Sequence, residues 1–138
     1  MPALPGFYEW KRLRGGKRKQ PYFIIRRDSD PIAFAGLWET WWGPDRQGEP
    51  VHTCTIITTD ANETMAPIHD RMPVILPPSA WDQWLDPTNN DTAALSELLV
   101  PAPASLLTAY PVATTVNNVR NDGPDLIAEA RPDQLVTG

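Results

Sequence analysis

Sixteen prolines among 138 residues restrict what this chain can fold into, and eight glycines add to the effect. Proline fixes one backbone angle and has no amide hydrogen, so it ends helices and interrupts the interior of sheets. We therefore predict short elements joined by fixed turns and exclude a bundle of long helices. The length suits one domain with a single core, and 41% hydrophobic residues indicate a folded chain.

Several segments have the alternation and composition of β-strands. They span residues 6–10, 21–26, 32–42, 51–59 and 74–76, with brief extended pieces near 106–110 and 112–116. In the longest of them, Gly36 marks a bend or a close neighbour. Its apolar side chains at two-residue spacing would share one face: Ile32, Phe34, Trp38 and Trp42. The strand at 51–59 is expected to be half-buried.

Two short helices are expected between the later strands. Ser79, with Asp82 three positions on, is placed to cap the first helix, and Asp91 is placed to cap the second. Each helix has an apolar stripe that can face a core: Trp81, Trp84 and Leu85 in the first, and Leu95, Leu98 and Leu99 in the second. The sequence thus predicts an α+β fold of mostly antiparallel strands with two or three short helices.

The charge is unevenly distributed. The net charge is −5, yet six of the twelve basic residues lie around Gly15 and Gly16: Lys11, Arg12, Arg14, Lys17, Arg18 and Lys19. Such a patch can hold phosphates on a protein that is acidic overall. Taken alone, such a run is more often a solvated hairpin tip.

No feature of the sequence indicates a membrane or an export pathway. No apolar run approaches the ~20 residues that cross a bilayer, and no signal-peptide pattern precedes the first strand. Cys54 is the single cysteine, so no internal disulfide can form. We expect a cytoplasmic protein.

Two side chains are candidates for proton transfer. Glu9 lies among Phe7, Tyr8 and Trp10, and loss of water there would favour its neutral form, which suits a general acid or base. His69 lies in the irregular segment 65–73, and an imidazole can take and give a proton near neutral pH. Alternatively, Glu9 could pair with a neighbouring basic residue, and the histidine could be structural.

Arg71 lies two residues after that histidine and is a permanent cation suited to a phosphate oxygen. A surface pair with Asp70 is the alternative. His52 and Cys54 would share a strand face, and His69 could join them, but a zinc site needs three or four protein ligands. We therefore expect no metal and no cofactor, and we expect Cys54 to be a small buried hydrophobe.

The order of these segments resembles the SOS-response-associated peptidase (SRAP) family over most of the chain, from residue 5 to about residue 127. The matching segments are Gly6-Phe7-Tyr8-Glu9-Trp10, Gln20-Pro21-Tyr22-Phe23-Ile24, Ala33-Phe34-Ala35-Gly36-Leu37-Trp38-Glu39, Thr55-Ile56-Ile57-Thr58-Thr59-Asp60-Ala61-Asn62, Ile68-His69-Asp70-Arg71-Met72-Pro73, Pro111-Val112, Val116-Asn117-Asn118 and Arg120-Asn121-Asp122-Gly123-Pro124.

The resemblance implies a strongly curved, barrel-like β-structure and an action on abasic sites in single-stranded DNA during the DNA-damage (SOS) response. Family members form a covalent protein–DNA crosslink through an N-terminal cysteine and have autopeptidase activity. Carried over by motif, Glu9 and His69 serve in proton transfers, and Arg71 contacts a DNA phosphate. Lys11, Lys17, Arg18 and Lys19 would add DNA contacts, and the protein would associate with the nucleoid.

One departure from the family pattern is large. A full member begins Met-Cys-Gly-Arg, whereas residue 2 here is proline. We expect one SRAP-like domain over residues 1–138, truncated at its N-terminus, that alone forms no crosslink because the nucleophile is absent. A truncated chain, a split gene and a start assigned too late stay open as origins. A non-catalytic single-stranded DNA-binding remnant and a structural remnant are the other readings, with self-association through exposed strand edges.

Overall fold

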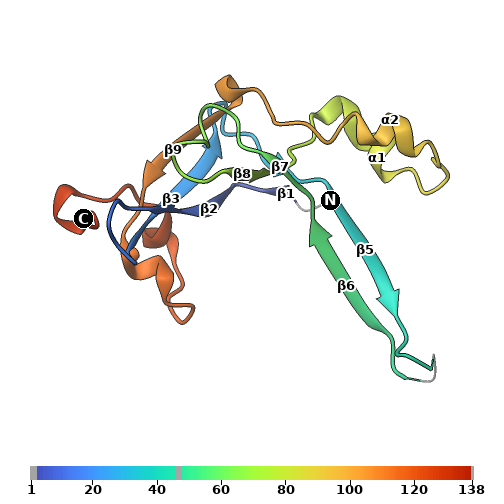
Figure 1. The fold of residues 1–138 in the computed structure, drawn as a ribbon, viewed down its shortest axis with the longest axis horizontal. Helices are drawn as coiled ribbons and strands as arrows, with labels where there is room; N and C mark the ends of the chain where they lie inside the picture. The colour runs from blue at the N-terminus through green and yellow to red at the C-terminus, as the bar shows by residue number, and fades with distance from the viewer. Residues whose placement is uncertain (1–2, 46–47, 138) are drawn as a thin grey trace.

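The computed structural model describes residues 3–45 and 48–137. Figure 1 shows a bent molecule: a three-stranded sheet at one end, two short helices at the other, and a hairpin that points away from both. Its strands are β1 Ala3–Leu4, β2 Gly6–Arg12, β3 Lys19–Arg26, β4 Ile32–Ala33, β5 Gly36–Trp41, β6 Val51–Ile56, β7 Thr58–Asp60, β8 Arg71–Pro73 and β9 Leu107–Pro111.

The helical elements are all short. They are α1 Trp81–Leu85, α2 Thr92–Ser96 and the 3-10 turns η1 Pro78–Ala80, η2 Ala104–Leu106, η3 Thr114–Asn117, η4 Pro124–Ile127 and η5 Pro132–Gln134. Within the described ranges, no helix is long and apolar enough to span a bilayer. The frequent prolines explain why helical turns end after three to five residues.

All paired strands run antiparallel. One sheet has the order β2-β3-β9, and β1–β4, β5–β6 and β7–β8 form two-stranded sheets. The predicted α+β class with mostly antiparallel strands and few short helices is confirmed. Closure of these sheets into a barrel stays a prediction.

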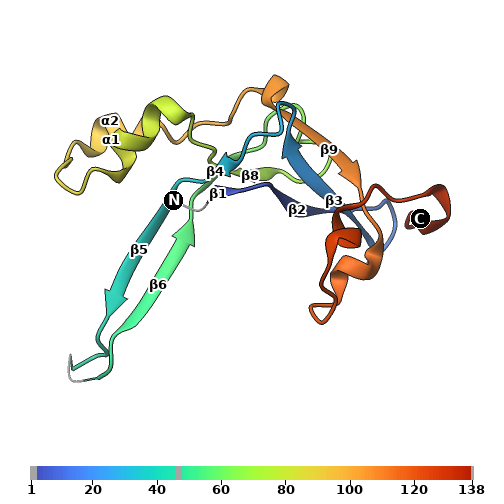
Figure 2. The ribbon, with the colours of Figure 1, turned by 180° about the vertical axis from the view of Figure 1, so that it is seen from behind.

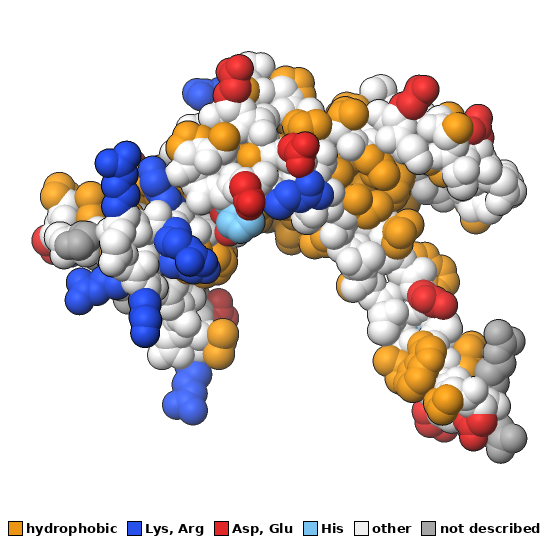
Figure 3. Space-filling view, in the orientation of Figure 1, with side chains coloured by type: hydrophobic (Ala, Val, Ile, Leu, Met, Phe, Trp, Pro, Cys, Tyr) orange, Lys and Arg blue, Asp and Glu red, His pale blue; other side chains and the backbone are white. Residues whose placement is uncertain are grey.

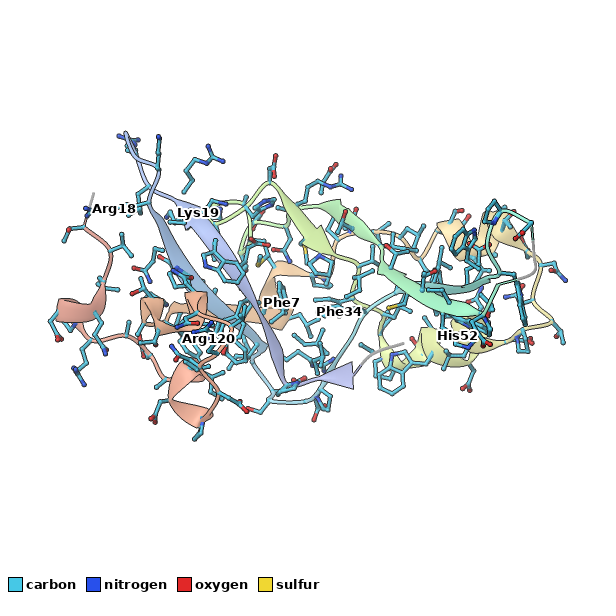
Figure 4. The ribbon with its side chains drawn as sticks, turned by 90° about the horizontal axis from the view of Figure 1, so that it is seen from below. Phe7, Arg18, Lys19, Phe34, His52 and Arg120 are labelled. Carbon is cyan, nitrogen blue, oxygen red and sulfur yellow. The ribbon has the colours of Figure 1, made fainter. Side chains whose placement is uncertain are left out.

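One face of the β2-β3-β9 sheet covers the main core. Phe7 and Glu9 point to this face, and their partners across the ladder are Ile24 and Tyr22. Phe7 meets Phe34 edge-on, with ring centroids 5.4 Å apart, and Figure 4 shows the two rings together near the middle of the molecule. The buried members of this core are Ile24, Ile32, Phe34, Met65, Met72, Ile75, Ala102 and Leu107.

The opposite face of the same sheet is aromatic. Tyr8 and Phe23 lie with ring centroids 5.0 Å apart, and Phe23 and Tyr110 with centroids 6.0 Å apart. The turns after β9 fold over this face, since Trp10 Nε1 donates to Asn117 Oδ1 at 2.7 Å. Burial raises the pKa of the Tyr8 and Tyr110 hydroxyls, because a desolvated phenolate is disfavoured.

A second, smaller core lies under the helices. Its buried members are Ala35, Val74 and Leu76, and side chains of α1 and the segment after α2 pack against them. The indoles of the first helix are fixed by hydrogen bonds: Trp81 Nε1 donates to the Leu76 carbonyl at 3.0 Å, and Trp84 Nε1 to the Gly36 carbonyl at 3.3 Å.

The strand expected over 32–42 is broken into β4 and β5. At the break, the Ala35 amide donates to the Val74 carbonyl and the Ala35 carbonyl accepts from the Ile57 amide, both at 2.9 Å. The chain therefore changes partners at Gly36. The four apolar side chains expected on one face separate accordingly: Ile32 and Phe34 are buried, whereas Trp38 is 77% exposed.

Other boundaries also differ. The segment 51–59 divides into β6 and β7, and the expectation that it is half-buried is wrong for β6, whose residues are all exposed. The strand expected at 74–76 lies at β8 instead, while Ile75 makes a single bridge to Phe34. The piece at 112–116 is extended only at Val112 and then becomes the 3-10 turn η3.

The two helix caps have different outcomes. Asp91 caps α2 as predicted, since its Oδ1 accepts from the Ala94 amide at 3.0 Å. Ser79 does not cap α1. It lies inside the turn η1, the N-cap of α1 is Ala80, and no side chain bonds there.

Replacing Asp91 by alanine should lower the free energy of unfolding by about 1 kcal/mol, because an amide of α2 loses its acceptor. Ser79→Ala is the matched control and should change it by less than about 0.5 kcal/mol. Urea denaturation followed by circular dichroism measures both. Equal losses in the two variants would contradict the cap assignment.

Candidate functional site

The loop 61–70 joins β7 to β8 and carries the candidate histidine. The two strands pair Asp60 with Arg71, and the Ala61 amide donates to the Asp70 carbonyl at 3.1 Å. The loop is therefore closed at its base. His69 is the second-last loop residue, next to this closure.

Met65 anchors the loop in the main core. Its side chain is fully buried, and its carbonyl accepts from the His69 amide at 3.0 Å. Asn62 fixes the start of the loop: its Oδ1 accepts from the Met65 amide at 3.0 Å, and its Nδ2 donates to the Ala102 carbonyl at 2.8 Å. Thr64 Oγ1 donates to the Ala104 carbonyl at 2.8 Å. The histidine backbone is thus held in one position.

The imidazole of His69 is oriented by the residue two positions on. Its Nδ1 accepts from the Arg71 amide at 3.0 Å. Asp70 Oδ1 lies 3.1 Å from the same nitrogen, but a neutral ring cannot accept from the amide and donate to the carboxylate through one atom. Because the amide can only donate, neutral His69 carries its proton on Nε2, and the ring is 43% exposed.

Arg71 is held by three groups on β7. Its Nη1 lies 2.7 Å from Asp60 Oδ1, and its Nη2 donates to the Thr58 carbonyl at 2.8 Å and to Thr58 Oγ1 at 3.3 Å. The guanidinium side chain remains 48% exposed. The ion pair is with Asp60 and not with Asp70, so the alternative pair considered from the sequence is wrong. A guanidinium has five N–H groups, so donors remain for another ligand.

Glu9 lies in the middle of β2 on the same side of the sheet as the main core. Its side chain is half-buried, and its Oε1 accepts from the Trp10 amide at 2.8 Å. Within the described ranges, Glu9 forms no ion pair with Lys11 or Arg12. The paired alternative is therefore not found.

Glu9 and the histidine loop share one side of the sheet. Met65 packs in the core that Phe7 and Ile24 also join, and Glu9 follows Phe7 on that face. The described side chains of Glu9 and His69 form no direct hydrogen bond or ion pair. Figure 3 shows basic side chains gathered at the end of the molecule that carries the β2–β3 turn.

The basic residues divide between the two faces of the sheet. Lys11 lies on the Glu9 face, whereas Lys19, opposite Arg12, lies on the aromatic face. Lys17, Arg18 and Lys19 line a surface hollow of about 520 Å3 together with Trp10, Thr114, Asn117 and Val136. Figure 4 shows both Arg18 and Lys19 at this end of the molecule. Arg71 belongs to β8 and is separate from this hollow.

The described residues contain no cluster of three or more His, Cys, Asp or Glu side chains placed to hold a metal ion. His52 is occupied on the hairpin, where its Nδ1 lies 3.0 Å from Thr40 Oγ1. Cys54 is exposed on β6, so the expectation that it is a buried hydrophobe is wrong.

Three supporting residues were not identified from the sequence. Asp60 and Thr58 hold Arg71, and Asn62 fixes the loop through both ends of its amide. An asparagine at the start of an irregular segment is typical of a turn closed by its own side chain, which was the available indication for Asn62. Nothing in the sequence pairs Asp60 with Arg71, since the pairing depends on the β7–β8 register.

Comparison with known proteins identifies the class to which this antiparallel α+β fold belongs. The family model described as SOS response associated peptidase (SRAP) matches residues 3–119. The chain belongs to the SRAP family, as its resemblance predicted.

Several relatives carry a common description. The chain is 50% identical over 121 residues to "Abasic site processing protein YoqW" of Bacillus subtilis, covering 88% of this chain and 53% of that protein. It is 40% identical over 141 residues to "Abasic site processing protein HMCES" of Gallus gallus, covering 88% and 40% respectively. The chain thus spans about half the length, or less, of these curated relatives.

A solved structure shares the fold. A protein from Bacteroides thetaiotaomicron superimposes with a TM-score of 0.78 at 31% identity, over 92% of this chain and 54% of that one.

In neutral His69, a proton is expected on Nε2 and none on Nδ1, because Nδ1 accepts from the Arg71 amide. Two-dimensional nitrogen–proton correlation of the imidazole above its titration range measures this directly. His52→Gln removes the second histidine and makes the assignment unambiguous. A proton found on Nδ1 would contradict the described hydrogen bond.

Proposed function

We propose that this chain supplies the acid–base and phosphate-binding part of a centre that processes abasic sites in single-stranded DNA. The observation that carries the proposal is the shared core: the face of β2 that presents Glu9 also packs against the loop that presents His69. The relatives named as abasic site processing proteins support the substrate class. A role in the DNA-damage response follows from this substrate.

Ring opening of an abasic deoxyribose needs two proton transfers. A base removes the proton of the C1 hydroxyl while an acid protonates the ring oxygen, and the bond between C1 and that oxygen breaks to leave an aldehyde. Glu9 and His69 fill these roles. The half-buried carboxylate of Glu9 accepts the hydroxyl proton, and His69 in its imidazolium form, with Nδ1–H facing Asp70 Oδ1 at 3.1 Å, gives its Nε2 proton to the ring oxygen and becomes neutral.

Arg71 binds a phosphate oxygen next to the reacting sugar. Asp60 and Thr58 already fix its guanidinium, so little side-chain freedom is lost when a phosphate binds. Lys11, Lys17, Arg18 and Lys19 extend the contact along the DNA backbone. The acidic net charge does not prevent this, since the field that a strand meets is local.

The place of action follows from the substrate. We infer that the protein works in the cytoplasm in association with the nucleoid, where single-stranded DNA arises. A non-catalytic single-stranded DNA-binding role is the second candidate. It is favoured by the hollow that combines Trp10 with Lys17, Arg18 and Lys19, since aromatic and basic side chains together bind single strands without sequence preference.

Arg71→Gln should weaken binding to an abasic single-stranded oligonucleotide and reduce the slope of log affinity against log salt by about 0.7, the value of one phosphate contact on a single strand. Fluorescence anisotropy at several salt concentrations measures both quantities. Arg27→Gln removes an exposed arginine at the far end of β3 and is the matched control. Equal slopes for the two variants would exclude the phosphate contact, and no binding at low salt would exclude both candidate functions.

Free cysteine added in solution should capture the ring-opened aldehyde faster in the presence of the chain, since Glu9 and His69 assist ring opening. Glu9→Gln and His69→Asn should each reduce this acceleration by about 10²-fold. Glu97→Gln and His52→Asn are the matched controls and should leave it unchanged. Liquid chromatography of the thiazolidine product follows the rate.

Mixtures of the chain with the abasic oligonucleotide, without and with free cysteine, distinguish the catalytic function from the non-catalytic one. Intact-mass analysis without added cysteine should show no adduct on the protein, because the single thiol, Cys54, lies in the middle of β6 and has no α-amino group beside it. Binding of the oligonucleotide with no acceleration of capture would reject the catalytic proposal and leave the non-catalytic one.

A further inference from the structure

The β5–β6 hairpin exposes large apolar side chains. Figures 1 and 2 show that it projects from the body, away from the three-stranded sheet and the helices. Its exposed apolar side chains are Leu37, Trp38, Trp41, Val51 and Ile56, with Trp42 directly after β5. The indoles of the two tryptophans in α1 are hydrogen-bonded, whereas in the described structure those of Trp38, Trp41 and Trp42 have no partner. So large an apolar surface marks an interaction site.

Both faces of the hairpin are apolar. The register pairs Trp38 with Cys54 on one face, and it pairs Trp41 with Val51 on the other. Leu37 shares the Trp41 face, and Ile56 shares the Trp38 face. A strand pair with one face in water alternates apolar and polar residues, whereas strands covered on both faces do not. The composition of this hairpin is therefore that of an interior layer.

The outer edges of the hairpin are also open. Among the described strands, β5 and β6 pair with each other alone. An isolated two-stranded hairpin is marginally stable in water, and unpaired edges are templates for a further strand. The occupant must therefore supply backbone hydrogen bonds as well as apolar side chains, which a polypeptide does by strand addition.

The charge of the described hairpin residues disfavours nucleic acid as that occupant. The described hairpin residues, 36–45 and 48–56, include Glu39 and Glu49 and no lysine or arginine, and Arg46 lies outside the described residues. A phosphate backbone would meet repulsion here. A second copy of this chain could cover one face by a symmetric contact but would leave the opposite face in water. A different polypeptide that covers both faces of the hairpin and pairs with its open edges would bury all of these apolar side chains.

We propose that the β5–β6 hairpin is the seam that joins this part of the SRAP fold to the polypeptide corresponding to the unmatched half of its relatives. The match covers 53% of the Bacillus YoqW protein and 54% of the Bacteroides structure, so those proteins have the length for a second half that encloses the hairpin. Formation of this seam requires no DNA. The experiment that tests it therefore gives a result whether or not the proposed catalytic function is correct.

Co-expression of the 138-residue chain with the unmatched part of YoqW tests the seam, with an affinity tag on the YoqW part. A one-to-one complex by light scattering is expected, with slower amide hydrogen exchange across β5 and β6. Trp38→Ser should weaken the complex by about thirtyfold, because a central aromatic anchor is lost. Trp38 is so exposed that the substitution leaves the core unchanged.

Val119→Ser is the matched control, because that valine is 97% exposed and lies outside the hairpin. It should leave the affinity unchanged. Three results would overturn the proposal: no complex although both polypeptides are soluble, a homodimer that Trp38→Ser dissociates, or protection of the hairpin amides by single-stranded DNA instead. If the YoqW part is insoluble alone, its recovery with the wild-type chain but not with Trp38→Ser supports the seam.

Discussion

Burial of Met65 beneath the three-stranded sheet is the interaction on which the arrangement of the candidate site depends. The same residue fills the core that Ile24 and Phe34 form and accepts the backbone hydrogen bond of His69. The loop would otherwise be a ten-residue connection with few apolar contacts. Because one buried side chain couples the loop to the sheet, the positions of Glu9 and His69 are determined by core packing and not by the flexibility of the loop.

Polar contacts that begin at this loop also fix the position of the Arg71 guanidinium. The amide of Arg71 orients the imidazole, and its side chain is held in turn by Asp60. The same residue thus joins the proposed phosphate contact to the tautomer of the histidine proposed for proton transfer. A substitution that displaces the β8 backbone would disturb both proposed roles, whereas one that removes only the guanidinium leaves the amide and the ring orientation in place.

Much of the fold could be predicted from the sequence. Strands 6–10 and 21–26 are confirmed within longer strands, since alternating aromatic and β-branched residues determine their period, and Asp91 caps α2 because capping is local. The predictions failed where distant segments decide the structure. Ala35 exchanges hydrogen bonds with Val74 and Ile57, which breaks the expected long strand, and no local pattern contains that information.

For the candidate site, too, local features could be predicted from the sequence and long-range contacts could not. Candidate residues are recognisable from their chemistry and from the family motif, but the ion pair of Arg71 with Asp60, eleven residues earlier, depends on strand register. The nearer Asp70 was the partner considered as the alternative, because sequence proximity is visible and register is not. Cys54 was expected to be buried since cysteine usually is, and its exposure follows from the hairpin as a whole.

The buried polar side chains in the described part of this molecule all have hydrogen-bond partners, whereas many of its large apolar side chains are exposed. No buried side-chain nitrogen or oxygen in the described residues lacks a hydrogen-bond partner, so no buried polar side chain around the loop needs a partner from another molecule. The apolar side chains of β5 and β6, in contrast, remain in water. The loop therefore keeps its geometry through contacts that the hairpin does not supply, because its anchors lie in the main core. Enclosure of the hairpin would add stability to the fold and leave the hydrogen bonds of His69 and Arg71 as they are.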